Sequence, residues 1–220
     1  MKEQIKNWIR AGYACLDVLT HEENRVQAAI ATAVFELKNE YAVYTWTVTK
    51  GLVRMPRPGS DEVWDPEMQD EFGVLDAVEQ LNPFSVVMLR DYHMFIEPTN
   101  AVHVRQIKDL LEHCRGQQKC VVLIGCRKVI PPELEREITI VDFPLPKESD
   151  FDAIINRLTE QNPSLERPEA DALARTYDSL KGQTTLQVEN SISISAVQGA
   201  AFDPVILSEE KSQNIRQSGL

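Results

Sequence analysis

The 220-residue sequence lacks any apolar run approaching the ~20 residues that a membrane-spanning helix requires. It also lacks an apolar stretch near its start, because residues 1–8 read Met-Lys-Glu-Gln-Ile-Lys-Asn-Trp, a mixed-charge segment unlike a signal peptide. We therefore expect no membrane partner and a cytoplasmic location.

Basic residues are too few to balance the acidic ones. The sequence holds 23 lysines and arginines against 34 aspartates and glutamates, which gives a formal net charge of -11 at pH 7. A surface with this excess of negative charge repels nucleic-acid phosphates, so we expect no nucleic-acid partner. We interpret the neighbouring Arg105, Lys108, Arg115 and Lys119 as the solvated face of one helix, with a local basic patch as the alternative.

Cysteine is scarce, and its spacing does not indicate a metal site. The four cysteines are Cys15, Cys114, Cys120 and Cys126. They lie in or beside apolar stretches of a chain without an export signal, so we expect reduced thiols in the core. The last three follow one another at intervals of six residues, which fits no common zinc pattern, and no metal site is predicted.

Apolar runs alternate with amphipathic segments up to Phe143. The runs are continuously apolar, as expected where helices cover both faces of a parallel sheet. The pattern predicts an α/β fold with a parallel sheet of about five strands flanked by helices. The predicted strands are residues 13–19, 41–49, 84–91, 119–125 and 137–143; the predicted helices are 1–11, 21–38, 66–81 and 99–115, with a loop over 51–66.

The pattern changes after Pro146. Residues 150–160 and 167–180 are predicted helices, whereas 184–197 is ambiguous, because Ser-Ile-Ser-Ile-Ser at 191–195 alternates as in a strand. We therefore divide the chain into three parts. These are an α/β domain over 1–146, a small, mainly helical, lid-like subdomain over 147–207, and a linker over 208–220.

The sequence also lacks a phosphate-binding loop. Such a loop reads G-x-x-x-x-G-K-[ST], because glycines let backbone N–H groups wrap the phosphates while a lysine and a hydroxyl complete the site. No glycine in the chain is followed by lysine. The turn at residues 20–25, where the loop would lie, carries Glu22 and Glu23, whose charge opposes polyphosphate. We therefore expect this segment not to hydrolyse ATP.

Several segments, in a fixed order, carry a family resemblance. The chain resembles the N-terminal region of a group of AAA-type ATPases from bacteria, phages and plastids, in which a degenerate AAA module precedes an active one. The resemblance covers most of the chain and is weakest over 51–71 and after Thr184. The matching segments are residues 9–13, 19–26, 86–93, 129–146 and 215–220.

This resemblance implies a P-loop-NTPase-like fold with a helical lid. It implies no cofactor for the segment itself, with ATP and Mg²⁺ bound by an active AAA module that follows Leu220. The implied partners are that AAA module of the same protein and the neighbours in a ring, and the resemblance allows a homo-oligomer.

Three positions of an active AAA module are altered here, according to the resemblance. The strand that should end in Asp-Glu ends in Asp91-Tyr92, so the glutamate that activates water is replaced. Gly125-Cys126-Arg127 stands in place of a polar sensor, usually asparagine, and Glu135-Arg136-Glu137 is a poor arginine-finger segment. The scaffold is recognisable, while the catalytic residues are gone.

His21, Asp91 and His93 are the remaining candidates for a functional site. They lie at or just after the carboxyl ends of predicted strands, where α/β sheets place functional groups. We interpret them as weak remnants of a site, with Asp91 capping the next loop and His21 starting a helix. The alternative is acid–base or metal chemistry, with Glu22, Glu23 and Asp91 around one metal ion.

The favoured hypothesis is a non-catalytic module that regulates, assembles or recruits partners for an ATPase. In this hypothesis the segment itself is no enzyme, while the longer parent protein is an ATPase. Two alternatives stay open. One is a metal-dependent hydrolase that uses His21, Asp91 and His93 together, and the other is a free-standing adaptor that docks on an AAA ring.

Overall fold

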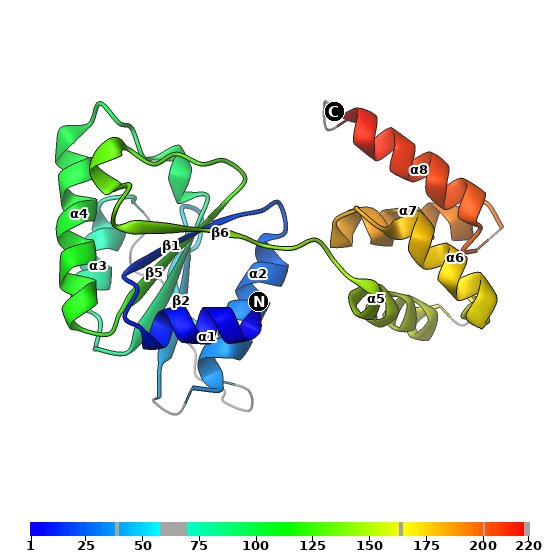
Figure 1. Cartoon of the computed structure of the whole chain (residues 1–220), viewed down its shortest axis with the longest axis horizontal. Coiled ribbons are helices and arrows are strands. Elements are labelled where there is room, and N and C mark those ends of the chain that lie inside the picture. The colour runs from blue at the N-terminus through cyan, green and yellow to red at the C-terminus, as the bar shows by residue number, and fades with distance from the viewer. Residues whose placement is uncertain (38–39, 58–69, 163–164, 200, 218–220) are drawn as a thin grey trace. The chain divides into compact units, whose positions relative to one another are not determined.

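The chain forms two compact units (Figure 1). The computed structural model describes residues 1–37, 40–57, 70–162, 165–199 and 201–217. Unit 1 covers Met1–Phe143 and unit 2 covers Pro144–Leu220. The predicted domain boundary at residue 146 lies just after the point where the structure divides.

Unit 1 is built around a six-stranded sheet with the order β3-β2-β4-β5-β1-β6. All neighbouring strands are parallel except β3, which runs antiparallel to β2. The α/β architecture predicted from the sequence is confirmed. The strands are β1 (Cys15–Leu19), β2 (Ala42–Thr47), β3 (Gly51–Arg54), β4 (Ser85–Arg90), β5 (Cys120–Gly125) and β6 (Ile138–Asp142).

The sheet has one strand more than predicted, because β3 lies in the segment predicted as a loop. Gly51 pairs with Thr47 and has a φ of 70°, a left-handed conformation that glycine adopts without strain. The chain turns back there, and Leu52 is buried in the same core as Trp46. The loop prediction was wrong because the prolines after Arg54 obscured a strand of only four residues.

Helices cover both faces of this sheet (Figure 1). On one face α1 (Lys2–Arg10) and α2 (Glu23–Phe35) form a core with Leu16 and Val18 of β1. On the other face α3 (Gly73–Gln80) and α4 (Ala101–Gly116) form a second core, which includes Cys15. Two short 3-10 helices, η1 (Tyr92–Met94) and η2 (Pro132–Leu134), complete the described elements of unit 1.

Helices α2 and α3 start later than predicted. Helix α3 begins at Gly73, and the first residues predicted for it lie in 58–69, outside the described residues. Thr20 does not cap α2; its Oγ1 accepts a hydrogen bond from the Glu22 N–H at 2.9 Å, and α2 begins at Glu23. The hydroxyl thus shapes the turn before the helix.

The described residues of unit 2 form four helices: α5 (Glu148–Gln161), α6 (Ala170–Leu180), α7 (Thr185–Val197) and α8 (Pro204–Gln217). Their apolar sides meet in a core that contains Phe151, Ile155, Leu180, Ile192 and Leu207. None of the helices in the described part of the chain combines the length and apolarity needed to cross a membrane.

Helix α7 settles the ambiguous segment. Thr184 and Gln187 form a capping box at its start, which fixes a helix despite the strand-like alternation. Two serines of the alternating run face inward and are hydrogen-bonded: Ser191 Oγ donates to Gln183 Oε1 at 3.0 Å, and Ser195 Oγ accepts from the Asp203 N–H at 3.2 Å. The alternation therefore reflects buried polar positions on a helix.

Residues 208–217, which were predicted as a linker, are helical in the structure. They belong to α8, which packs on α6 and α7. Asn214 Nδ2 donates to Gln183 Oε1 at 3.2 Å, and Ser208 Oγ lies 3.4 Å from Ser179 Oγ. Residues 218–220 lie outside the described residues.

Candidate functional site

The carboxyl ends of β1, β4 and β5 lie side by side at the same end of the sheet. Backbone hydrogen bonds join the segments that follow them: the Thr20 N–H donates to the Gly125 carbonyl, and the Asp91 N–H donates to the Ile124 carbonyl, both at 2.8 Å. Open α/β sheets bind ligands at the carboxyl ends of their strands. The carboxyl-end region (residues 20–25, 90–93 and 125–127) is therefore the candidate site.

The turn after β1 is held by an ion pair. The Glu22 side chain is buried, and its Oε2 accepts hydrogen bonds from Arg25 Nε at 3.0 Å and from an Arg25 terminal nitrogen at 2.5 Å. The Arg25 guanidinium also lies 4.5 Å from the centre of the Phe143 ring. The charge of Glu22 is thus compensated locally, and Arg25 joins the turn to the end of β6.

A second ion pair links this turn to β4. Arg90 Nε donates to Glu23 Oε2 at 2.7 Å, and a further Arg90 nitrogen lies 3.5 Å from Gln27 Oε1. Thr45 Oγ1 contacts the same Gln27 oxygen at 3.2 Å. The Arg90 side chain therefore reaches α2, and its positive charge is used within the protein.

Asp91 joins the end of β4 to β5 through its backbone N–H, which donates to the Ile124 carbonyl. The residue is exposed and has a φ of 55°, which places it in the left-handed region that aspartate tolerates better than most residues. Its side chain accepts no capping hydrogen bond at η1. The loop-capping role that we predicted for the Asp91 carboxylate is therefore wrong.

Tyr92, at the position that the resemblance assigns to the catalytic glutamate, points into the core. Its side chain is buried, and its Oη lies 2.7 Å from both the Glu71 carbonyl oxygen and His103 Nε2. Burial raises the pKa of the Tyr92 hydroxyl far above its ordinary value. Tyr92 is thus a neutral packing group at neutral pH.

His93 is buried against the end of β5. Only 7% of the residue is exposed, and its Nδ1 has no hydrogen-bond partner among the described residues. A Cβ atom added to Gly125 would lie 2.3 Å from that Nδ1 and 2.8 Å from Cε1. Gly125 is therefore the residue that makes room for the His93 ring.

The predicted site residues do not form a constellation. His21 and Asp91 are exposed whereas His93 is buried, and no hydrogen bond between described residues joins any two of them. Within the described ranges, no group of three or more His, Cys, Asp or Glu side chains could hold a metal ion. Glu22 and Glu23 each pair with an arginine instead.

The cysteines differ in exposure. All four thiols are free; Cys15, Cys114 and Cys120 are buried, whereas Cys126 is exposed in the carboxyl-end region. Burial raises the pKa of the Cys114 thiol to about 11. The expectation of core thiols holds for these three cysteines and is wrong for Cys126.

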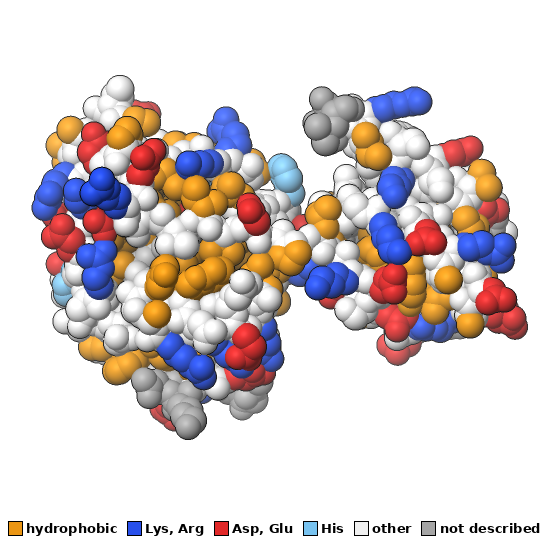
Figure 2. Space-filling model, in the orientation of Figure 1, with side chains coloured by type: hydrophobic (Ala, Val, Ile, Leu, Met, Phe, Trp, Pro, Cys, Tyr) orange, Lys and Arg blue, Asp and Glu red, His pale blue; other side chains and the backbone are white. Residues whose placement is uncertain are grey.

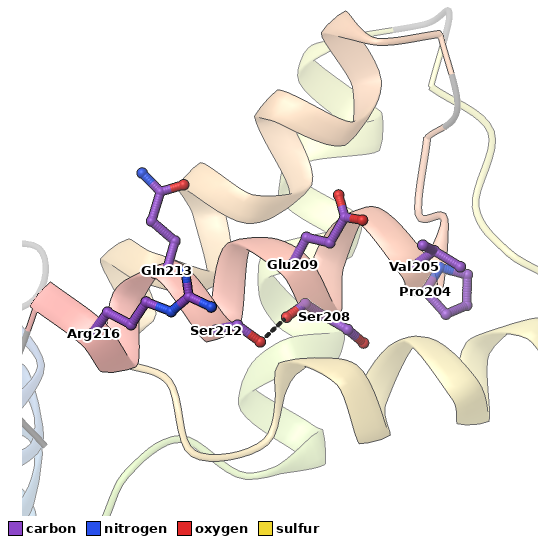
Figure 3. A pocket seen from close by; sticks show the side chains of 7 residues that line it. All are labelled: Pro204, Val205, Ser208, Glu209, Ser212, Gln213 and Arg216. Carbon is purple, nitrogen blue, oxygen red and sulfur yellow. Dashed lines mark hydrogen bonds between the residues drawn. The ribbon is translucent and has the colours of Figure 1, made fainter.

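A hollow on unit 2 lies along the outer side of α8 (Figure 3). Its lining includes Val205, Ser208, Ser212 and Arg216. Ser212 Oγ donates to the Ser208 carbonyl at 2.9 Å, so this serine is satisfied within the helix. The described lining comes from α8 alone, and no feature of it identifies a ligand.

Four residues have roles in unit 1 that were not predicted, namely Asp17, Arg25, Arg90 and Gly125. The Glu22–Arg25 pair was visible as an i, i+3 spacing at a helix start. Asp17 was visible as a charge inside an apolar strand, and the structure buries it to 4% exposure. Arg90 and Gly125 carried no local signal, because their partners come from distant parts of the chain.

The boundaries of unit 1 coincide with those of a known family. Residues 1–143 match the family described as SpoVK-like AAA ATPase, N-terminal domain. The chain belongs to this family. The matched range ends at Phe143, where unit 1 ends in the structure.

Relatives of this SpoVK-like N-terminal domain are described as uncharacterized AAA domain-containing proteins, ycf46. The relative from Guillardia theta is 29% identical over 163 residues, which cover 72% of this chain and 30% of the relative. The relative from Pyropia yezoensis is 24% identical over 221 residues, which cover 99% of this chain and 43% of the relative. The chain therefore spans less than half the length of these relatives.

Solved structures show the same fold. A DNA replication initiation factor superposes with a TM-score of 0.55 at 12% identity, over 97% of this chain and 63% of that one. Domain III of the Thermotoga maritima replication initiation protein DnaA gives 0.54 at 10% identity, over 96% of this chain and 90% of that one. At this identity the likeness concerns the fold alone.

Proposed function

We propose that this chain is a non-catalytic module of an AAA family ATPase, which regulates, assembles or recruits partners for an ATP-hydrolysing module elsewhere in a longer protein. The observation that carries the proposal is the filled turn after β1. The resemblance to AAA modules assigns this turn to the phosphate loop, and here Glu22 and Glu23 are each paired with an arginine.

Polyphosphate would meet unfavourable chemistry in this turn. The Arg25 and Arg90 side chains already bind glutamates, and polyphosphate would approach two carboxylates without the glycine-rich backbone that wraps phosphates. Tyr92 in the core supplies no base for an attacking water. The matched regions cover only 30% and 43% of the two relatives, so a longer protein of this kind has room for a module that binds ATP and Mg²⁺.

The nucleotide part of the proposal is tested by titrating the 220-residue chain with ATP and Mg²⁺ in a calorimeter. We expect no saturable binding tighter than about 1 mM, and no rise in melting temperature at 5 mM nucleotide, since a ligand stabilises only a fold that binds it. Saturable binding below that limit, abolished in an Arg90→Met variant, would contradict the proposal.

The regulatory part is tested on the longer protein. We expect removal of residues 1–217 to change its ATP turnover or its assembly state while some hydrolysis remains, because the active site lies elsewhere. A rate and an oligomer distribution identical to those of the intact protein would contradict a regulating or assembling role. The metal-dependent hydrolase receives no support, because no described residues form a metal site.

A further inference from the structure

One crossover of unit 1 lacks the usual helix. The chain from β5 to β6 passes over β1, because β1 lies between those two strands in the sheet. Its residues 126–137 contain only the short turn η2, whose Leu134 is buried in the core with Cys15. The cover over β1 and β6 on this face is therefore thin.

Asp17 lies on β1 beneath this thin cover. Its side chain faces the same side of the sheet as that of Cys15, two residues earlier, and it is 4% exposed. Within the residues that the structure describes, its carboxylate takes part in no hydrogen bond or ion pair. A buried, unpaired carboxylate is costly, and burial raises the pKa of Asp17 to about 6 while Lys128 lowers it only in part.

The outer edge of the sheet is open beside Asp17. In the described sheet β6 pairs with β1 alone, and Asp17 is the register partner of Ile140. Ile140 therefore projects from the same face, and it is 42% exposed. Figure 2 shows hydrophobic side chains gathered on the face of unit 1 along which β6 runs in Figure 1. An open strand edge with an apolar side chain is a place where another strand can pair.

We propose that the outer edge of β6 binds an extended segment of a protein partner, whose arginine or lysine side chain crosses Ile140 and pairs with Asp17. This inference deepens the proposed recruiting role, and it rests on that role only in naming a protein as the partner. The backbone of β6 would form hydrogen bonds with the backbone of the added strand, and Asp17 would favour a segment with arginine or lysine at the facing position.

The geometry fits such a segment. Neighbouring strands lie ~4.8 Å apart, so a strand added beyond β6 lies ~10 Å from β1. The apolar stem of an arginine or lysine rests on Ile140 while its charged head reaches Asp17. Asp142 lies two residues beyond Ile140 on the same face, and the chain carries a net charge of -11, so the surroundings also favour a basic partner.

The test is a selection of binders to the 220-residue chain from a random library of nine-residue peptides. We expect enriched peptides to alternate β-branched residues and to carry arginine or lysine at one fixed position. A synthetic peptide of the enriched sequence should bind the Asp17→Asn variant about ten- to a hundredfold more weakly, the range for a charge-assisted hydrogen bond. The same peptide with glutamine at the basic position should bind both proteins equally.

Two variants and one modified peptide serve as controls. Asp142→Asn makes the same charge change on the same face at an exposed position, and we expect it to alter binding less than about threefold. Ile140→Lys places a cation of the chain itself beside Asp17 and should abolish the preference for a basic peptide. N-methylation of alternate peptide amides should prevent binding, because it blocks strand pairing.

Repeating the selection on the Asp17→Asn variant and obtaining the same basic consensus would overturn the proposal, and so would an equal loss of peptide binding in Asp142→Asn. Absence of any basic position in the enriched peptides would overturn it as well. These experiments contain no nucleotide, so a negative result here does not bear on the proposal that the chain does not bind ATP. Tryptophan fluorescence checks that each variant is folded, because Trp8 and Trp46 lie in the described part of unit 1.

Discussion

The carboxyl-end region and the β6 edge treat their carboxylates in opposite ways. Glu22 and Glu23, just after β1, each bind an arginine at hydrogen-bond distance. Asp17, five residues before Glu22 on the same strand and turn, is buried without a partner among the described residues. The carboxylates of the first region are thus neutralised within this chain, while Asp17 keeps a buried charge that the proposed basic partner would neutralise.

The largest expected effect breaks the close packing of the carboxyl-end region. Gly125→Ala would place a Cβ atom 2.3 Å from His93 Nδ1, and the buried ring cannot move without displacing its neighbours. We expect a loss of about 3 kcal/mol in the free energy of unfolding of unit 1, as for an overpacked core. Urea unfolding followed by tryptophan fluorescence measures it.

Gly116→Ala is the matched control for that substitution. A Cβ atom on Gly116 would meet nothing within 4 Å, and the residue is the last of α4, so we expect no loss of stability. His93→Ala in the Gly125→Ala background should recover part of the loss. If the two substitutions destabilise additively, contact between the His93 ring and position 125 is not the cause.

The second-largest effect is the change in stability when the buried charge of Asp17 is removed. The pKa of this carboxyl is raised from 3.8 to about 6 in the folded protein, so the folded state takes up a proton before the unfolded state as the pH falls. Its charge therefore costs stability progressively between about pH 4 and pH 6, and the full cost is present above pH 6. We expect Asp17→Asn to stabilise unit 1 by about 2 kcal/mol at pH 7.

Urea unfolding of wild type and Asp17→Asn at pH 4 and pH 7 measures this dependence. The difference between the two proteins should be large at pH 7 and small at pH 4, where Asp17 is protonated in the folded state. A difference that is the same at both pH values would mean that the charge of Asp17 is compensated within the chain. The enriched basic peptide should reduce the difference at pH 7.

The smallest effect concerns the ion pair of Glu23 and Arg90. Both side chains are 23% exposed, so solvent screens the pair, and we expect Arg90→Met to destabilise unit 1 by about 1 kcal/mol. Glu23→Gln should cost little more in the Arg90→Met background, since the partner is already lost. Additive losses in this double-mutant cycle, measured by urea unfolding, would show that the pair is not coupled.

Much of the fold followed from local patterns. Continuous apolar runs separated by amphipathic segments predicted a parallel sheet covered on both faces, since each run must bury both of its sides. The strand β3 escaped prediction because four residues give no usable period. Helix α7 was ambiguous because its hydrophobic alternation is typical of a strand; the capping box of Thr184 and Gln187, which the prediction did not use, is the local signal for a helix.

The candidate site was less predictable. The turn at residues 20–25 was located correctly as acidic, because its composition can be read without a fold. The sequence could not show that Arg90 meets Glu23, which lies 67 residues away. It could not show either that His93 packs on Gly125, or that Asp17 stands beside Ile140, because these contacts depend on the order of strands in the sheet.

The α/β class and the absence of a Gly-Lys phosphate loop can be read from the chain before it folds, because apolar periodicity and motif chemistry are local properties. The tertiary structure alone decided which charges are paired. Folding brings the end of β4 to α2, so Arg90 reaches Glu23, and it places β1 inside the sheet beneath a crossover without a helix, so Asp17 is buried beside an open edge. Charge compensation depends on distances in space, and these exist only after the strands have assembled.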